Sequence, residues 1–283
     1  MKWTNDRSEN VDDRRGSGGG GGMLVGGGLG TLIIAAIIFF LGGDPSAILS
    51  SGTANSGAQT EQRDLTQQEV QVREFVSMVT VETEQTWGKI FQENNMQYSA
   101  PKVVMFESAT QSGCGPAQSA MGPFYCPADQ TVYMDMSFFK ELESRFGAKV
   151  TEFSIAYVIA HEIGHHVQTL LGTTQKVDQL RGKYSEADMN RVSVATELQA
   201  DFYAGVWAKQ TDSREQFLEP GDIESAISAA EAVGDDNIQK RSQGYVNQEG
   251  FTHGSSAQRK EWFMKGYNTG DIRQGDTFNS LLR

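Results

Sequence analysis

The chain has 283 residues and a formal net charge of −12, with 36 acidic and 24 basic side chains. This acidic balance argues against a nucleic-acid partner, because phosphate backbones are bound by basic surfaces. Hydrophobic residues make up 38% of the chain, which is enough to build a core, and two cysteines are too few for a disulfide scaffold.

The N-terminal part of the chain differs in composition from the rest. Residues 1–22 are polar and end in a glycine-rich stretch, and residues 23–43 carry no charge. A helix over 23–43 is long enough to cross a bilayer core of about 30 Å at about 1.5 Å per residue. We therefore predict a transmembrane helix there. A cleaved signal peptide is the alternative, but its apolar region is typically about 7–15 residues long.

Basic residues flank this apolar run on one side only. Four Lys and Arg residues precede it, and none follows until Arg63. The positive-inside rule then places residues 1–22 in the cytoplasm and the rest outside it, as a single-pass inner-membrane protein with a periplasmic domain. Small polar residues over 44–63 predict a linker, and the composition of a folded domain begins at 64 and continues to 283.

The expected domain over 64–283 belongs to the α+β class and is mostly helical with a small sheet. Apolar residues recur at helical spacing over 65–95, and short apolar or alternating runs over 102–108 and 130–136 predict strands. Further helices are predicted at 137–147, 151–171, 185–209, 220–233 and 255–269, with Thr151, Ser185 and Ser255 or Ser256 as N-caps.

Three of the four histidines lie within the sequence HEIGHH at 161–166. His161 and His165 are four residues apart, so on a helix they share one face and can bind one ion. Neutral imidazole suits Zn²⁺. Glu162 lies beside the first ligand, where its carboxylate can take a proton from a zinc-bound water without binding the metal. Gly164 suits the close approach of another backbone or of a ligand.

The alternative to a metal site is a helix with ordinary surface or core histidines. The position of the motif inside the helix predicted at 151–171 favours the metal site. His166 points away from the face that the two ligands share, so we interpret it as a packing residue or as a residue behind the ligands.

A catalytic zinc site needs a third protein ligand. Glu197 and Asp201 are four residues apart on the helix predicted at 185–209, among apolar neighbours. We predict Glu197 as the third ligand and Asp201 as the acceptor for the free ring N–H of a zinc-bound histidine. A solvated acidic face is the alternative, but buried carboxylates need partners. Glu186 and Asp188 are assigned to the N-terminal end of this helix, where negative charge is favourable.

His253 is the remaining histidine, and it lies on a glycine-containing turn before the last predicted helix. The transition state of peptide hydrolysis carries an oxyanion that needs a donor besides the metal, and His253 is a candidate for that catalytic role. Tyr245, Tyr267 and Arg259 are further candidates. A loop histidine that is merely exposed is the alternative.

Cys114 and Cys126 are close in sequence. If the domain lies outside the cytoplasm, a disulfide between them is the expected state. Metal binding by these cysteines is the second possibility, but their spacing does not favour it.

Taken together, these motifs resemble the bacterial, membrane-anchored family of "putative neutral zinc metallopeptidases". The resemblance covers nearly the whole chain and implies a zincin-like domain in which His161 and His165 bind zinc and Glu162 is catalytic. Glu197 matches the third ligand of the wider gluzincin-like group. Members of the family often carry Cys where this chain has Phe202, which leaves zinc binding unaffected. The resemblance rests on NVDDRRG at 10–16, CGPAQSAMGPFYCPADQTVYMDMSFF at 114–139, HEIGHHVQ at 161–168, ELQADFYAGVWA at 197–208 and THGSSAQRKEWF at 252–263.

The resulting functional hypothesis is a membrane-anchored zinc metallopeptidase that hydrolyses a peptide or protein substrate. Two alternatives stay open: a zinc-stabilised binding or scaffolding module without turnover, and a zinc hydrolase of a non-peptide amide. A sheet edge that pairs with an extended substrate would favour the peptidase, and the strand at 130–136 is a candidate for such an edge.

Overall fold

The structure is a computed structural model that describes residues 1–15, 63–118 and 121–282. Its centre is a four-stranded sheet in the order β1-β2-β6-β5, in which β1, β2 and β6 are parallel and β5 is antiparallel to β6. These strands are β1 (Val11–Asp13), β2 (Lys102–Phe106), β5 (Phe124–Cys126) and β6 (Thr131–Asp135). A separate antiparallel hairpin consists of β3 (Ala109–Ser112) and β4 (Gly115–Gln118).

Helices make up most of the described chain, which confirms the prediction of a mostly helical α+β protein. The expected N-caps Thr151, Ser185 and Ser255 each accept a backbone N–H bond at the start of a helix. The helices are α3 (Gln67–Glu93), α4 (Phe138–Ser144), α5 (Glu152–Leu170), α6 (Thr173–Asp178), α7 (Glu186–Glu215), α8 (Asp222–Ala232), α9 (Asp235–Gln243), η3 (Gln248–Gly250), α10 (Ser256–Thr269), η4 (Ile272–Gln274) and α11 (Thr277–Leu281).

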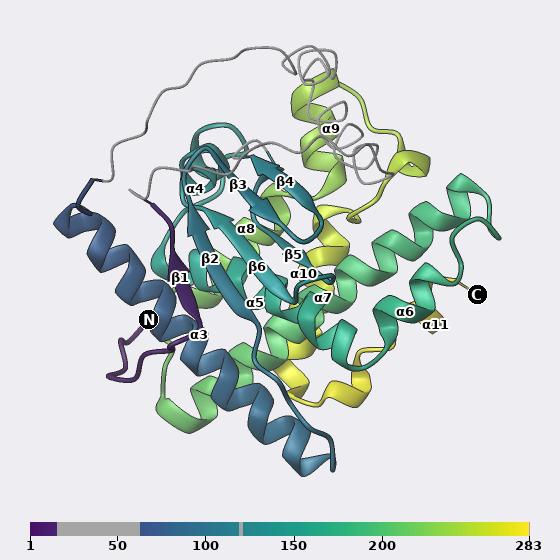
Figure 1. The fold of residues 1–283 in the computed structure, drawn as a ribbon. Coiled ribbons are helices and arrows are strands. Elements are labelled where there is room, and N and C mark those ends of the chain that lie inside the picture. The colour runs from purple at the N-terminus through teal and green to yellow at the C-terminus, as the bar shows by residue number, and fades with distance from the viewer. Residues whose placement is uncertain (16–62, 119–120, 283) are drawn as a thin grey trace.

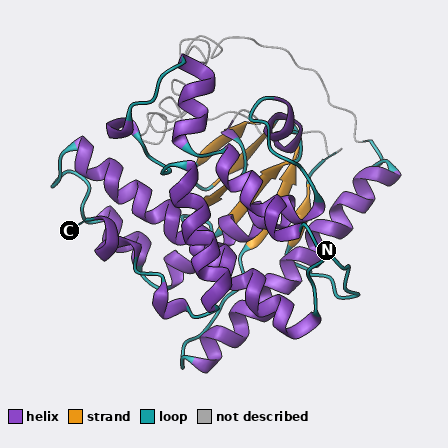
Figure 2. Cartoon of the chain, turned by 180° about the vertical axis from the view of Figure 1, so that it is seen from behind, coloured by secondary structure: helices purple, strands orange, loops and turns teal. Residues whose placement is uncertain are grey.

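The sheet is covered on both faces. Side chains such as Val103 and Val132 belong to the main core, which they share with the helices that lie behind the sheet in Figure 1 and cover it in the view from behind (Figure 2). Val104 and Tyr133 belong to a smaller core together with Ala117 of the β3–β4 hairpin. Alternate residues of β2 and β6 therefore face two different cores, as the pleat of a strand requires.

The strand predicted at 130–136 is not an edge strand. It is β6, and it pairs with β2 on one side and with β5 on the other. The two edges are β1 and β5, and β5 is a strand of three residues that contacts α5. Sequence analysis missed β5 because a run of three residues is too short to show the alternation of a strand.

Strand β1 comes from the first 15 residues, which pack into the same body as the rest. Val11 pairs with Val103 of β2, and the side chain of Met1 lies in the main core. The Arg15 side chain is also buried. The prediction set residues 1–22 apart from the domain, whereas in the structure residues 1–15 share its sheet and its core.

The transmembrane helix predicted at 23–43 lies outside the described residues, as does nearly all of the linker predicted at 44–63. Within the described ranges, none of the helices combines the length and the apolar character that a membrane span needs.

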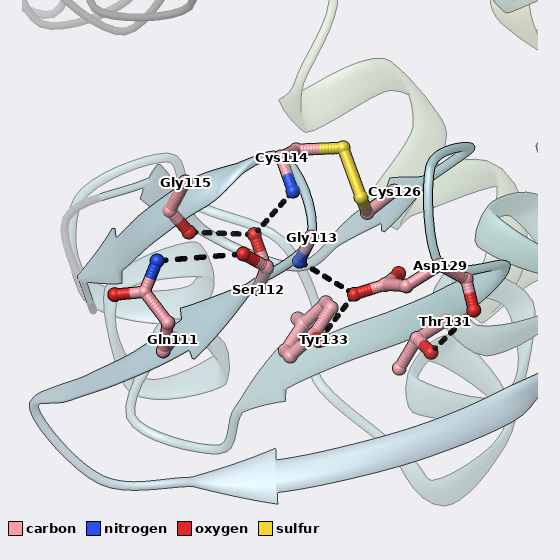
Figure 3. Close-up of a disulfide and its surroundings, with 9 residues drawn as sticks. All are labelled: Gln111, Ser112, Gly113, Cys114, Gly115, Cys126, Asp129, Thr131 and Tyr133. Carbon is pink, nitrogen blue, oxygen red and sulfur yellow. Dashed lines mark hydrogen bonds between the residues drawn. A yellow bond between two sulfur atoms is a disulfide. The ribbon is translucent and has the colours of Figure 1, made fainter. Parts of the chain in front are cut away.

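The two cysteines form a disulfide, which ties the turn of the β3–β4 hairpin to the edge strand β5 (Figure 3). The same turn is held by Asp129, whose carboxylate accepts hydrogen bonds from the Gly113 amide at 2.6 Å and from the Tyr133 hydroxyl at 2.8 Å. The disulfide predicted between Cys114 and Cys126 is present, and the cysteines do not act as metal ligands.

Candidate metal centre

Helices α5 and α7 carry the candidate site and pack closely against each other. A Cβ atom placed on Gly164 would lie 2.9 Å from the carbonyl oxygen of Ala200, closer than real Cβ atoms approach such an oxygen. Glycine at this position therefore lets the HEIGHH segment of α5 lie against α7. The close approach expected at Gly164 is a contact with another backbone.

This packing brings together His161, His165 and Glu197, whose candidate ligand atoms all lie within 4.8 Å of one another. Nε2 of His161 is 3.2 Å from one carboxylate oxygen of Glu197, and Nε2 of His165 is 3.5 Å from the other. Two imidazole nitrogens and one carboxylate oxygen form a donor set that suits a catalytic zinc ion. The three residues could therefore bind a metal.

The Nδ1 atom of His161 faces a buried polar cluster. It lies 2.8 Å from Asp201, which also accepts hydrogen bonds from Tyr157 at 2.5 Å and from Arg259 at 2.8 and 2.9 Å. All four side chains are buried. Asp201 thus occupies its predicted place behind the first ligand. Sequence analysis missed Tyr157 and considered Arg259 only as an oxyanion donor.

The Nδ1 atom of His165 has a neutral partner, the side-chain oxygen of Gln168 at 2.9 Å. Gln168 is buried and lies three residues after His165, so both side chains share one face of α5. With both Nδ1 atoms engaged, the Nε2 atoms of the two histidines are the ones turned toward Glu197. The three-residue spacing between His165 and Gln168 could have predicted this contact from the sequence, but the sequence analysis did not use it.

The electrostatics of the cluster favour a cation at its centre. Burial alone would lower the pKa of His161, but the carboxylates of Asp201 and Glu197 outweigh it and raise the pKa to about 10. Burial likewise opposes the shift of Glu197, yet the charge of His165 and the hydrogen bonds from His161 and His165 hold its pKa well below its usual range. A site that holds a proton this firmly also attracts a divalent cation, which competes with that proton for the nitrogens.

Glu162 is buried, and it follows His161 directly on α5. Within the described residues its carboxylate accepts no hydrogen bond from another side chain or from the backbone. It is therefore available to a water or a substrate group at the cluster, as the sequence predicts for the catalytic residue.

His253 lies near the cluster, on the turn before α10, and its side chain is 39% exposed. Its Nδ1 atom is 3.4 Å from Asp235, whose other oxygen accepts the backbone N–H groups of Thr252, His253 and Gly254. Burial opposes the shift, but Asp235 and the charge of Glu197 raise the pKa of His253. The structure thus places His253 within electrostatic reach of Glu197, and it adds Asp235, which the sequence analysis missed.

The other sequence candidates lie elsewhere. Tyr245 is 64% exposed in the loop after α9, and Tyr267 lies beside Lys209. The ring of His166 points away from the cluster: Nε2 donates to the Ser99 carbonyl at 2.7 Å and Nδ1 lies 3.0 Å from the Tyr125 hydroxyl. His166 is therefore a packing residue, the first of the two roles predicted for it.

The acidic residues at the start of α7 lie in its first turn, as expected. Asp188 pairs with Arg191 and accepts from Ser185; Glu186 is exposed and Asp188 is partly exposed. Neither belongs to the metal cluster.

The chain is similar to two proteins that bear the name "uncharacterized". Protein YpfJ of Escherichia coli K12 is 46% identical over 224 residues, which cover 79% of this chain and 77% of that protein. Protein Rv2575 of Mycobacterium tuberculosis H37Rv is 47% identical over 192 residues, which cover 65% of this chain and 64% of that protein. No solved structure is significantly similar to the chain, so the zincin-like fold stays a prediction.

The family model described as "Putative neutral zinc metallopeptidase" matches residues 1–278. The match extends over the N-terminal strand, the cluster on α5 and α7, and the turn that carries His253. The chain therefore belongs to the family of this description.

Proposed function

We propose that this protein is a zinc-dependent peptidase whose metal is held by His161, His165 and Glu197. The observation that carries the proposal is the convergence of these three donors within 4.8 Å. The buried Glu162 follows His161 directly and has no hydrogen-bond partner among the described residues. Bound zinc would lower the pKa of a coordinated water toward about 7 and polarise a peptide carbonyl.

The chain's own residues account for the proton transfers. The Glu162 carboxylate accepts a proton from the attacking water and then delivers it to the nitrogen of the leaving amine. Since Asp235 lies on the Nδ1 side of His253, the remaining ring nitrogen, Nε2, is available to donate a hydrogen bond to the developing oxyanion. Asp201 and Gln168 orient the two imidazoles from behind.

The edge strand β5 supports a peptide as the substrate class. It leaves one side of the sheet without a partner strand among the described residues, and it contacts α5. An extended peptide can add to such an edge through backbone hydrogen bonds.

We further propose that the folded domain works outside the cytoplasm and is attached to a membrane through the apolar run at 23–43. The disulfide between Cys114 and Cys126 supports an oxidising compartment. Membrane attachment rests on the composition of the apolar run alone.

The direct test of the mechanism is Glu162→Gln. We expect the variant to keep zinc, because Glu162 is not a ligand, and to lose at least about 100-fold in kcat, the usual contribution of a positioned general base. The assay is hydrolysis of fluorescein-labelled casein by the purified full chain, with zinc measured on the same samples. Glu186→Gln, a change to an exposed carboxylate at the start of α7, is the matched control and should match the wild type.

Equal rates for Glu162→Gln and the wild type would refute the assigned base. If the wild type bound zinc and hydrolysed neither casein nor a peptide library, the metal centre would stand and the peptidase assignment would fall in favour of a binding module.

A further inference from the structure

A chain of buried amides leads from the second zinc ligand to the C-terminal segment. Nδ1 of His165 is 2.9 Å from Oε1 of Gln168, and Nε2 of Gln168 is 3.1 Å from Oε1 of Gln199. Nε2 of Gln199 in turn donates to the carbonyl oxygen of Gly275 at 2.8 Å. Gln168 is 1% exposed and Gln199 is 7% exposed, so this series of hydrogen bonds is shielded from water.

The Gly275 carbonyl fixes the orientation of both amides in this series of hydrogen bonds. The carbonyl oxygen of Gly275 can only accept, so the NH₂ group of Gln199 must face it and the oxygen of Gln199 must face Gln168. Gln168 then turns its NH₂ group toward two acceptors, Gln199 and the Thr196 carbonyl at 2.7 Å. Its oxygen is left facing His165.

The consequence for His165 is a fixed ring tautomer. An amide oxygen in front of Nδ1 requires that Nδ1 carry the hydrogen, because two acceptors would otherwise face each other in a buried place. The lone pair needed for zinc is then on Nε2, the nitrogen that lies 3.5 Å from Glu197. If either amide were reversed, the hydrogen of His165 would be favoured on Nε2, and the lone pair on Nδ1 would point away from the metal site.

The acceptor at the far end is itself held in place. A Cβ atom on Gly275 would lie 2.6 Å from the ring of Phe202 on α7, so only glycine lets the turn approach this closely. Two residues later, the hydroxyl of Thr277 donates to the carbonyl oxygen of Ala195, also on α7, at 2.6 Å. The segment from η4 to α11 is thereby fixed against the helix that carries Glu197.

We propose that Gln199 is a positioning residue for the metal centre, and that it transmits the acceptor position of Gly275 through Gln168 to the tautomer of His165. The inference rests on the proposed zinc site. It gives the C-terminal segment, which contributes no ligand, a defined part in metal binding. His161 has no need of such a relay, because the carboxylate of Asp201 can only accept.

The test compares three variants of the full chain by zinc competition with a chelator. Gln199→Met keeps the length and the helix propensity of the side chain but removes both hydrogen bonds, and it should weaken zinc binding about tenfold or more. Gln210→Met is the matched control. It removes a similar bond from α7 to the Gly270 carbonyl, far along the helix from the ligands, and should leave the affinity unchanged.

Gln199→Glu separates the relay from a simple structural tie. The carboxylate loses the bond to Gly275, so the protein should be less stable, but it still accepts from Gln168 and should keep zinc binding near that of the wild type. If Gln199 only held the C-terminal segment against α7, zinc affinity would follow the stability of the protein. Gln199→Glu would then bind zinc more weakly than Gln199→Met.

The second readout is the ¹⁵N spectrum of the histidine side chains in the zinc-loaded protein. The relay predicts a slowly exchanging Nδ1–H of His165 in the wild type and in Gln210→Met, and faster exchange in Gln199→Met. Wild-type affinity together with unchanged Nδ1–H exchange in Gln199→Met would overturn the proposal. Failure of the wild type itself to bind zinc would overturn the metal centre, and the relay with it.

Discussion

At the scale of single residues, the two histidines of the proposed zinc site differ in the partner of their Nδ1 atoms. His161 faces Asp201, whose pKa is lowered to about 2: burial opposes this shift, and Arg259 and His161 outweigh it. His165 faces the neutral amide of Gln168. A carboxylate makes an imidazole a stronger donor to a metal than an amide does. The ring of His161 is thus oriented by a charged partner, and the ring of His165 by a neutral hydrogen bond.

His166 provides a prediction on pH. Burial lowers its pKa below the ordinary 6.5, so the folded state binds this proton more weakly than the unfolded chain does. His166 therefore contributes stability above about pH 6.5 that is lost as the pH falls through that value. We expect the difference in unfolding free energy between the wild type and His166→Gln to shrink by at most about 1.4 kcal/mol per pH unit between about pH 7.5 and 5.5.

The measurement is urea unfolding of both proteins with EDTA present. His161, His165 and His253 have raised pKa values and act in the opposite direction, but they are common to both proteins and cancel in the difference. A difference that does not change with pH would show that His166 takes up its proton equally in the folded and unfolded states.

The sequence predicts those site residues whose spacing on one helix is diagnostic. His161, His165, Glu197 and Asp201 follow from i, i+4 pairs, and the structure brings all four together. Arg259 and Asp235 could not be predicted in this way, because they come from other elements. Their positions depend on how α10 and α9 pack, which no local pattern contains.

At the scale of elements, glycines decide how closely the helices of the site cross. A Cβ atom on Gly205 of α7 would lie 2.0 Å from the carbonyl oxygen of Phe263 on α10. One on Gly266 of α10 would lie 2.0 Å from the carbonyl oxygen of Phe202 on α7. The two helices meet backbone to backbone, and this contact carries Arg259 of α10 to Asp201 of α7.

We therefore expect Gly205→Ala to destabilise the protein by about 1–3 kcal/mol, because overpacking outweighs the roughly 1 kcal/mol that alanine gains in helix propensity. Gly88→Ala on α3 is the control: nothing lies within 4 Å of its Cβ, so it should stabilise by up to about 1 kcal/mol. Thermal unfolding of both variants measures this. A Gly205→Ala protein as stable as Gly88→Ala would contradict the close crossing.

The long helices, the helix α4 and the central strands β2 and β6 were predictable from the sequence, whereas most other short elements were not. The observed α5 and α7 begin at the predicted caps, and α3 lies within the predicted 65–95. The helix α9 and the strands β1, β3, β4 and β5 were missed. Each is short, and tertiary packing rather than local periodicity determines its conformation.

At the scale of the whole molecule, the described residues on either side of 16–62 both contact Glu69 at the start of α3. Arg15 donates to the backbone carbonyl of Glu69 at 2.7 Å, and Arg63 pairs with the Glu69 carboxylate at 2.6 Å. Residues 1–15 and the start of the domain therefore meet in one folded body.

The basic residues from which the orientation was predicted also have partners within the fold. Three of the four basic residues that the positive-inside rule counted form ion pairs of the fold, including Arg7 with Glu74 and Arg15 with Asp13. The sequence pattern of residues 1–15 gave no sign of this, because Val11 is the only apolar residue of β1.

This arrangement predicts the effect of truncation. A chain that begins at residue 64 lacks β1 and the buried Met1, whose side chain alone contributes about 1.5–3 kcal/mol. Its Tm should be lower by roughly 3–12 °C than that of a chain in which a short Gly-Ser linker replaces residues 16–62. Calorimetry of the two proteins compares them. Equal Tm values would show that the first 15 residues do not belong to the folded body.

The central claim is that α5 and α7 together hold one zinc ion, and the most direct test is the metal content of the purified full chain. We expect about one zinc per chain in the wild type and in His253→Ala, and none in His161→Ala or Glu197→Ala. Zinc retained by Glu197→Ala would show that the third ligand lies elsewhere. A folded wild type without zinc, after incubation with the metal, would contradict the account.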